Sequence, residues 1–166
     1  MRGGYEIALF ALLLVATATD LLWGKIFNWL TFPFLLTGLI ARFAFGGVAD
    51  LSQGLTAIAV AFALFFPLYV VRAIAAGDAK LLMAMAAWTD STTIVQVAAI
   101  AIVIGAAVGL FSLLRQKGFR GSAASVAENV AQGAPTSNAL KMPFGPAFLC
   151  AYLVVNIAQL RHWELL

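Results

Sequence analysis

The sequence predicts an all-α, polytopic membrane protein with about six transmembrane helices, the fourth of them short. Three observations favour this fold class: the composition, the apolar runs and the short chain. Of the 166 residues, 63% are hydrophobic and 10% are charged, against about 45–50% and about 25% in a typical soluble domain. Long runs contain no acid or base. A chain this short cannot enclose so many apolar side chains in its own interior, so lipid must surround much of it.

Six apolar runs predict the helices. They cover residues 5–22, 27–45, 53–75, 79–88, 92–114 and 143–160. Because each full span needs roughly 20 residues, we expect a single transmembrane domain over residues 1–166, with a long polar loop at about 115–142. We expect the first helix to be retained rather than cleaved as a signal peptide, because Arg2 is a weak basic start and further spans follow at once.

The basic residues predict the orientation in the membrane. The first, third and fifth loops share one side and carry seven of them: Lys25, Arg72, Lys80, Arg115, Lys117, Arg120 and Lys141. The other side receives both termini and carries three: Arg2, Arg42 and Arg161. Lys and Arg concentrate in cytoplasmic loops, so we expect the odd loops in the cytoplasm and both termini outside. The net charge of +3 is thus a topology signal, and we expect a lipid bilayer and no nucleic acid as partner.

The fourth predicted helix is too short to cross the membrane. Some 11 residues at 1.5 Å each cover only about half of a 30 Å hydrocarbon core. The loop 75–80 before it is therefore expected partly inside the bilayer, where non-helical backbone survives only beside protein or water. This predicts a water-filled cavity near Asp78.

Two of the seven acids are candidates for chemistry. Asp20 and Asp78 each adjoin the predicted cytoplasmic end of a helix, next to apolar sequence, where a charge is costly. Structural explanations remain open for both, since Asp78 fits an N-cap of the fourth helix and Asp20 fits the point where the first helix meets water. The other acids are expected to be solvated surface charges: Glu6, Asp50, Asp90, Glu128 and Glu164.

Considered together, Asp20 and Asp78 predict aspartic-protease chemistry. Two carboxylates that approach to about 3 Å cannot both ionise, so one keeps a proton and the other stays charged. The charged member takes a proton from a water, and the protonated member polarises the scissile carbonyl. We therefore expect no metal and no cofactor. The lone His162 and Cys150 make Ser-His, Cys-His and multi-cysteine zinc sites improbable.

Three strings of residues resemble those of a known family. Asp20 precedes Lys25-Ile26-Phe27-Asn28, Ala76-Gly77-Asp78-Ala79-Lys80 follows the third predicted helix, and Pro143-Phe144-Gly145-Pro146 opens the last. Together they resemble the type IV prepilin peptidases, a family of GxGD membrane aspartyl proteases. The resemblance is greatest to the short form found with Flp or tight-adherence pilus systems.

The resemblance implies an activity and its catalytic residues. Asp20 and Asp78 map onto the two catalytic aspartates of the family, while Phe27 and Ala75 replace its usual proline and the first glycine of GxGD. It implies removal of a short basic leader from a prepilin or pseudopilin at the cytoplasmic face of the bacterial inner membrane. The chain has one cysteine and so lacks the paired cysteines of the longer members, and no methyltransferase activity is expected.

Five further residues are expected to support the site or to contact the substrate: Gly77, Lys25, Asn28, Lys80 and Arg72. Gly77 is expected to need the permissive backbone angles of glycine. The three basic residues either pair with acidic groups near the cut or serve only as positive-inside anchors.

Two alternatives to a peptidase remain open at this stage. One is a catalytically inactive membrane component of pilus assembly, and the other is a small proton-linked transporter that uses its buried acids. A transporter is expected to carry an inverted internal repeat. Comparison of helices one to three with helices four to six reveals no duplicated string.

Overall fold

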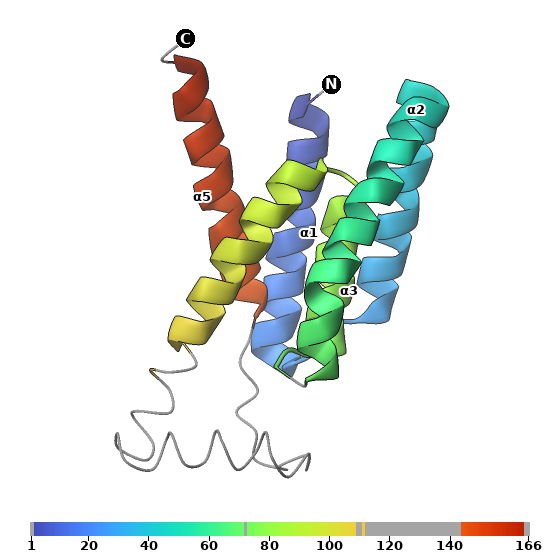
Figure 1. Cartoon of the computed structure of the whole chain (residues 1–166). Coiled ribbons are helices and arrows are strands. Elements are labelled where there is room, and N and C mark those ends of the chain that lie inside the picture. The colour runs from blue at the N-terminus through green and yellow to red at the C-terminus, as the bar shows by residue number, and fades with distance from the viewer. Residues whose placement is uncertain (1, 72, 109–110, 112–143, 165–166) are drawn as a thin grey trace.

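The protein is a bundle of helices. The structure, a computed structural model, describes residues 2–71, 73–108, 111 and 144–164. Its labelled helices are α1 (Arg2–Trp23), α2 (Asn28–Val70), α3 (Ala76–Ala86) and α5 (Gly145–Glu164), and an unlabelled helix covers Ser91–Val108 (Figure 1). Since no strand occurs within the described ranges, the predicted all-α class is confirmed. Arg72 and the predicted loop at about 115–142 lie outside the described residues.

α2 folds back on itself at Gly47 and forms two adjacent arms (Figure 1). Gly47 has φ 66° and ψ −158°, a backbone conformation that residues with a Cβ rarely adopt. The chain therefore reverses at a single residue. The arms, 28–46 and 48–70, correspond to the second and third predicted helices. The prediction that the third helix continues to residue 75 is wrong, because α2 ends at Val70.

A buried arginine joins the hairpin of α2 to the end of α3. Arg42 is 6% exposed, and its guanidinium donates hydrogen bonds to the carbonyls of Ala87 (2.8 Å) and Thr89 (2.7 Å). It also forms an ion pair with the Asp50 carboxylate at 2.8 Å. These partners compensate for the solvation that the buried charge loses. The expectation that Asp50 is merely a solvated surface charge is wrong, because Asp50 neutralises this arginine.

α3 lies inside the bundle rather than at its outer surface. Leu81, Leu82 and Met85 are fully buried, and Figure 1 places α3 between α1 and the arms of α2. Because protein surrounds it, a helix of 11 residues can end at membrane depth without exposing its terminal backbone groups to lipid. α3 begins at Ala76 rather than at residue 79, so Asp78 lies within the helix and not in the loop before it.

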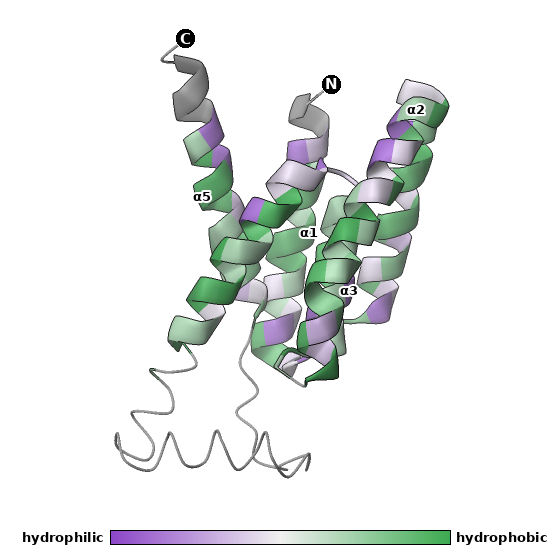
Figure 2. Ribbon diagram, in the orientation of Figure 1, coloured by the Kyte–Doolittle hydropathy of each residue, from purple (hydrophilic) through white to green (hydrophobic). Residues whose placement is uncertain are grey.

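Three helices are long and apolar enough to cross a membrane, namely Tyr5–Trp23, Asn28–Val70 and Ser91–Val108, and α5 contributes the shorter apolar stretch Gly145–Gln159. Hydrophobic residues cover most of their length, with hydrophilic residues mainly toward the ends (Figure 2). These lengths and compositions indicate a membrane protein. The predicted count of about six spans is not confirmed.

Different helix termini lie at the two ends of the bundle. The N-terminus of α1 and the C-terminus of α5 lie at one end (Figure 1), where the hairpin of α2 also lies. The other end holds the last turn of α1 and the first turns of α2, α3 and α5. Residues separated by more than a hundred positions thus meet at the end opposite the termini.

Candidate active site

Two aspartates are buried at the end of the bundle opposite the termini. Asp20 lies in the last turn of α1 and is 7% exposed, and Asp78 lies in the first turn of α3 and is 5% exposed. Of the acids whose side chains the structure describes, only these two are buried. A carboxylate removed from water loses a large solvation free energy, so each needs donors within the bundle.

Asp20 receives its donor from the start of α5. The backbone N–H of Gly145 donates a hydrogen bond of 2.7 Å to Oδ2 of Asp20. A Cβ on Gly145 would lie 3.0 Å from the Thr17 Cα and 3.1 Å from the Asp20 Cβ, so only glycine allows this approach without a shift. The first N–H groups of a helix have no partner within the helix, and its N-terminus favours negative charge. α5 therefore stabilises and orients the Asp20 carboxylate.

This role of Gly145 is not predicted by the sequence. A partial signal was present, because the string Pro143–Pro146 marks the start of the last helix and hence a set of unpaired N–H groups. The string itself does not indicate which side chain accepts hydrogen bonds from these N–H groups, because Asp20 lies 125 positions away in the sequence.

Asp78 receives its donor from its own helix. Its Oδ2 accepts a hydrogen bond of 3.1 Å from the backbone N–H of Ala75, the N-cap residue of α3. Asp78 is not the N-cap residue itself, because it occupies the third helical position, but its carboxylate accepts an amide proton at the start of the helix, as the structural interpretation expected. A carboxylate in the first helical turn is stabilised by the helix dipole.

The two aspartates belong to helices α1 and α3 but lie at the same end of the bundle. A contact links their surroundings, because Ile26, in the connection that follows α1, lies against Gly77, the residue before Asp78. The approach of the two carboxylates to about 3 Å stays a prediction.

Gly77 is needed for space and not for backbone freedom. Among the described glycines, positive φ angles occur at Gly24 and Gly47, and Gly77 is an ordinary helical residue of α3. The expectation that it needs permissive backbone angles is therefore wrong. A Cβ at this position would lie 3.2 Å from the Cβ of Ile26, so glycine here lets the connection after α1 approach α3 closely.

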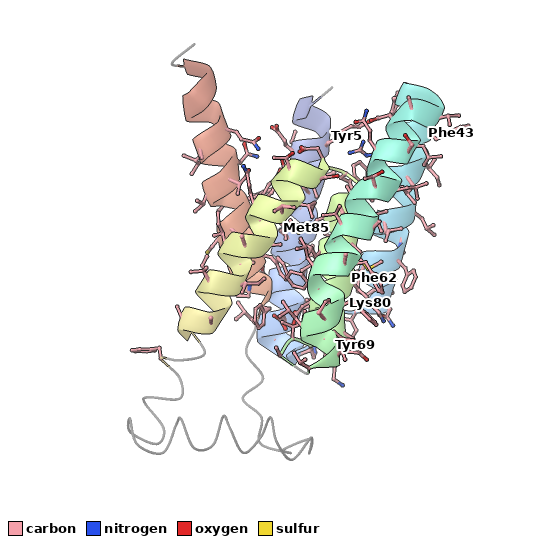
Figure 3. The ribbon with its side chains drawn as sticks, viewed as in Figure 1. Tyr5, Phe43, Phe62, Tyr69, Lys80 and Met85 are labelled. Carbon is pink, nitrogen blue, oxygen red and sulfur yellow. The ribbon has the colours of Figure 1, made fainter. Side chains whose placement is uncertain are left out.

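Two of the predicted supporting residues contact each other near the aspartates. Nζ of Lys80 donates a hydrogen bond of 3.0 Å to Oδ1 of Asn28 and lies 6.0 Å from the centroid of the Phe32 ring. Figure 3 places Lys80 toward the same end as Tyr69, away from Tyr5. Lys25 is exposed in the connection between α1 and α2. The structure therefore brings Lys80 and Asn28 together on different helices.

Asp90 has a structural role at the opposite end. Its carboxylate accepts hydrogen bonds from the N–H (3.0 Å) and the hydroxyl (2.8 Å) of Thr93, at the start of the Ser91–Val108 helix. Burial favours the neutral form of Asp90, but these hydrogen bonds outweigh it and hold the pKa of the carboxyl below its usual value. Asp90 is thus a helix cap, not simply a solvated charge.

A cavity of about 890 Å³ lies at the same end of the bundle as the two termini. Its lining includes Tyr5, Glu6, Asp90, Tyr152 and Asn156, and it includes neither Asp20 nor Asp78. The predicted water-filled cavity near Asp78 stays a prediction. Within the described part of the chain, no group of three His, Cys, Asp or Glu side chains has the arrangement to hold a metal ion.

Comparison with known proteins places the chain in a family. A model described as the type IV leader peptidase family matches residues 7–110, a range that contains both buried aspartates and ends before α5. Searches of the curated proteins and of the solved structures gave no match. The resemblance derived from the sequence is confirmed at this level: the chain belongs to the type IV leader peptidase family.

Proposed function

We propose that the protein is an intramembrane aspartic endopeptidase that removes the short basic leader from type IV or Flp-type prepilins. One observation carries the proposal. Asp20 and Asp78, on two different helices, are both buried at the same end of an apolar bundle. Buried acids in membrane helices mark functional sites more often than structural ones, and family membership implies a leader peptidase.

The pair supplies the two functions that peptide hydrolysis requires. The charged carboxylate accepts a proton from a water as the water attacks the scissile carbonyl, and the protonated carboxyl donates a hydrogen bond to the carbonyl oxygen. The proton taken from the water then passes to the leaving amine. The hydrogen bonds from Gly145 and Ala75 hold one oxygen of each carboxylate and leave the other oxygen for water and substrate. Such orientation matters for the rate, because a catalytic group displaced by about 1 Å can slow a reaction about 10²-fold.

The substrate and the membrane face follow from the family and the charge distribution. A prepilin or pseudopilin leader is basic. We place the site at the cytoplasmic face of the bacterial inner membrane because the described basic residues Lys25 and Lys80 lie at the same end of the bundle as Asp20 and Asp78. Lys80, held by Asn28, and the exposed Lys25 are positioned to pair with acidic groups beside the cut. We propose peptidase activity without methyl transfer.

Both departures from the family pattern are compatible with the observed backbone. Ala75 has φ −81° and ψ 153°, an extended conformation that any residue adopts, so a glycine there is not required. Phe27 has φ −79° and ψ 137°, close to the angles of a proline. Its ring also contacts Trp23 and Trp29, with centroids 5.9 and 6.3 Å away. Neither residue therefore argues against an active site.

Asp20→Asn and Asp78→Asn should each abolish leader removal and leave an inserted protein at normal levels. An amide keeps the shape and the acceptor oxygen of the carboxylate but cannot exchange a proton at neutral pH, so cleavage should fall by about 10³-fold or more. The measurement is the mass of prepilin co-produced with each variant.

Asp90→Asn is the matched control, because an asparagine still caps the helix at Thr93 and this residue lies at the opposite end. It should process prepilin at the parent rate. Release of mature pilin by either active-site variant at a rate near the parent would contradict the pairing and favour a non-catalytic role in pilus assembly.

Thiol labelling tests the orientation in a Cys150→Ala background. A cysteine at Val48, which is 72% exposed beside the α2 hairpin, should react in intact cells whose outer membrane alone is permeable. A cysteine at Ser122, in the basic loop predicted at 115–142, should react only after the inner membrane is broken. The reverse pattern would place Asp20 and Asp78 on the wrong side and exclude cytoplasmic cleavage.

Gly77→Val should lower both the thermal unfolding temperature and the cleavage rate, because a branched side chain must displace Ile26. Overpacking of this kind costs about 1–3 kcal/mol. The double variant Gly77→Ala with Ile26→Ala restores the space and should recover most of the loss seen with Gly77→Ala alone.

Ala75→Gly serves as the comparison and should not raise activity, since Ala75 already has relaxed backbone angles. Parent-like unfolding of Gly77→Val would show that the close approach of Ile26 is unimportant.

A further inference from the structure

A threonine beside Asp20 has a hydroxyl that the bundle does not satisfy. Thr17 lies on α1 one turn before Asp20, and residues three apart share a face of a helix. The same face meets the start of α5, because a Cβ built on Gly145 would lie within 3.1 Å of atoms of both Thr17 and Asp20. Thr17 is therefore located where α1, α5 and the Asp20 carboxylate converge.

The hydroxyl Oγ1 of Thr17 is buried and has no hydrogen-bond partner. It is the only such side-chain atom among the residues whose side chains the structure describes. Threonines in helices commonly donate to the carbonyl of the preceding turn, and Thr19 does so, with its Oγ1 2.9 Å from the Ala16 carbonyl oxygen. The hydroxyl of Thr19 therefore has a hydrogen-bond partner within its own helix. The hydroxyl of Thr17, whose backbone lies against Gly145, has none.

An unsatisfied buried hydroxyl lowers stability, so its presence at a functional site calls for an explanation. No side chain or backbone group of the described residues supplies the missing bond. A bound peptide can supply it. A peptide drawn into an apolar bundle brings backbone N–H and C=O groups, each of which needs a partner there.

We propose that Thr17 is a substrate-positioning residue whose hydroxyl hydrogen-bonds the peptide backbone next to the scissile bond. This inference rests on the proposed peptidase function and assigns a residue of the same site. In the bound state a backbone group of the peptide lies against Oγ1 and beside the second oxygen of Asp20, while Oδ2 of Asp20 keeps its hydrogen bond from the Gly145 N–H. Thr17 takes no part in proton transfer.

The test compares Thr17→Val with Thr19→Val, two nearly isosteric changes on the same helix. Each variant is purified as the full chain, its cleavage of prepilin is followed to obtain kcat and KM, and its thermal unfolding is measured. Thr17→Val should lower kcat/KM about tenfold, the effect of losing one hydrogen bond of about 1.4 kcal/mol. Its unfolding temperature should be unchanged or higher, because an unsatisfied hydroxyl has been removed. Thr17→Ser keeps the hydroxyl and should have a kcat/KM near that of the parent. Thr19→Val should also cleave prepilin at the parent rate.

Three outcomes overturn the proposal. Parent-like cleavage by Thr17→Val shows that the hydroxyl does not contact the substrate. An equal loss with Thr19→Val, or a loss accompanied by a lower unfolding temperature, shows that Thr17 is structural. In these first two outcomes the parent protein still cleaves prepilin and Asp20→Asn does not, so the proposed peptidase function is unaffected. Failure of the parent itself to cleave prepilin overturns the function and this inference together.

Discussion

Two carboxylates must be kept in an apolar helix bundle, and the arrangement at this end of the molecule satisfies that constraint. Removing a carboxylate from water is among the largest penalties a fold can carry, so each aspartate needs donors and a favourable field. Both obtain them from helix N-termini. α5 directs the Gly145 N–H at Asp20, and α3 directs the Ala75 N–H at Asp78. α1, α3 and α5 thus converge where the two carboxylates receive these hydrogen bonds.

The remaining features of the site serve that convergence. Glycine at 145 lets α5 reach α1, and glycine at 77 lets the connection after α1 reach α3. α3 starts near Asp20 because it is short and surrounded by protein, and Arg42 holds its other end through the carbonyls of Ala87 and Thr89.

The sequence predicts those features that local pattern determines. Hydropathy identifies the all-α class and most of the helices, and the rarity of acids in apolar sequence selects Asp20 and Asp78, both of which are buried. The family resemblance adds Asn28 and Lys80, which contact each other. Local pattern fails to predict other features. It fails where the determinant is a contact distant in sequence. The donor to Asp20, the space required at Gly77 and the ion pair of Arg42 with Asp50 depend on which surfaces meet. Hydropathy also misplaces the start of α3, because an aspartate in a first helical turn and one in the preceding loop have the same local pattern.

The central claim is that Asp20 and Asp78 form one site, and their proximity is measured most directly by chemical cross-linking. Cysteines are placed at both positions in a Cys150→Ala protein and treated with dibromobimane, a short reagent that fluoresces strongly only after two thiols have reacted. The account predicts a fluorescent intramolecular product that forms readily in the folded protein. A pair at positions 78 and 90, at opposite ends of the bundle, should give none. Absence of the product for positions 20 and 78 in folded protein, with both thiols shown to be reactive, would contradict the account.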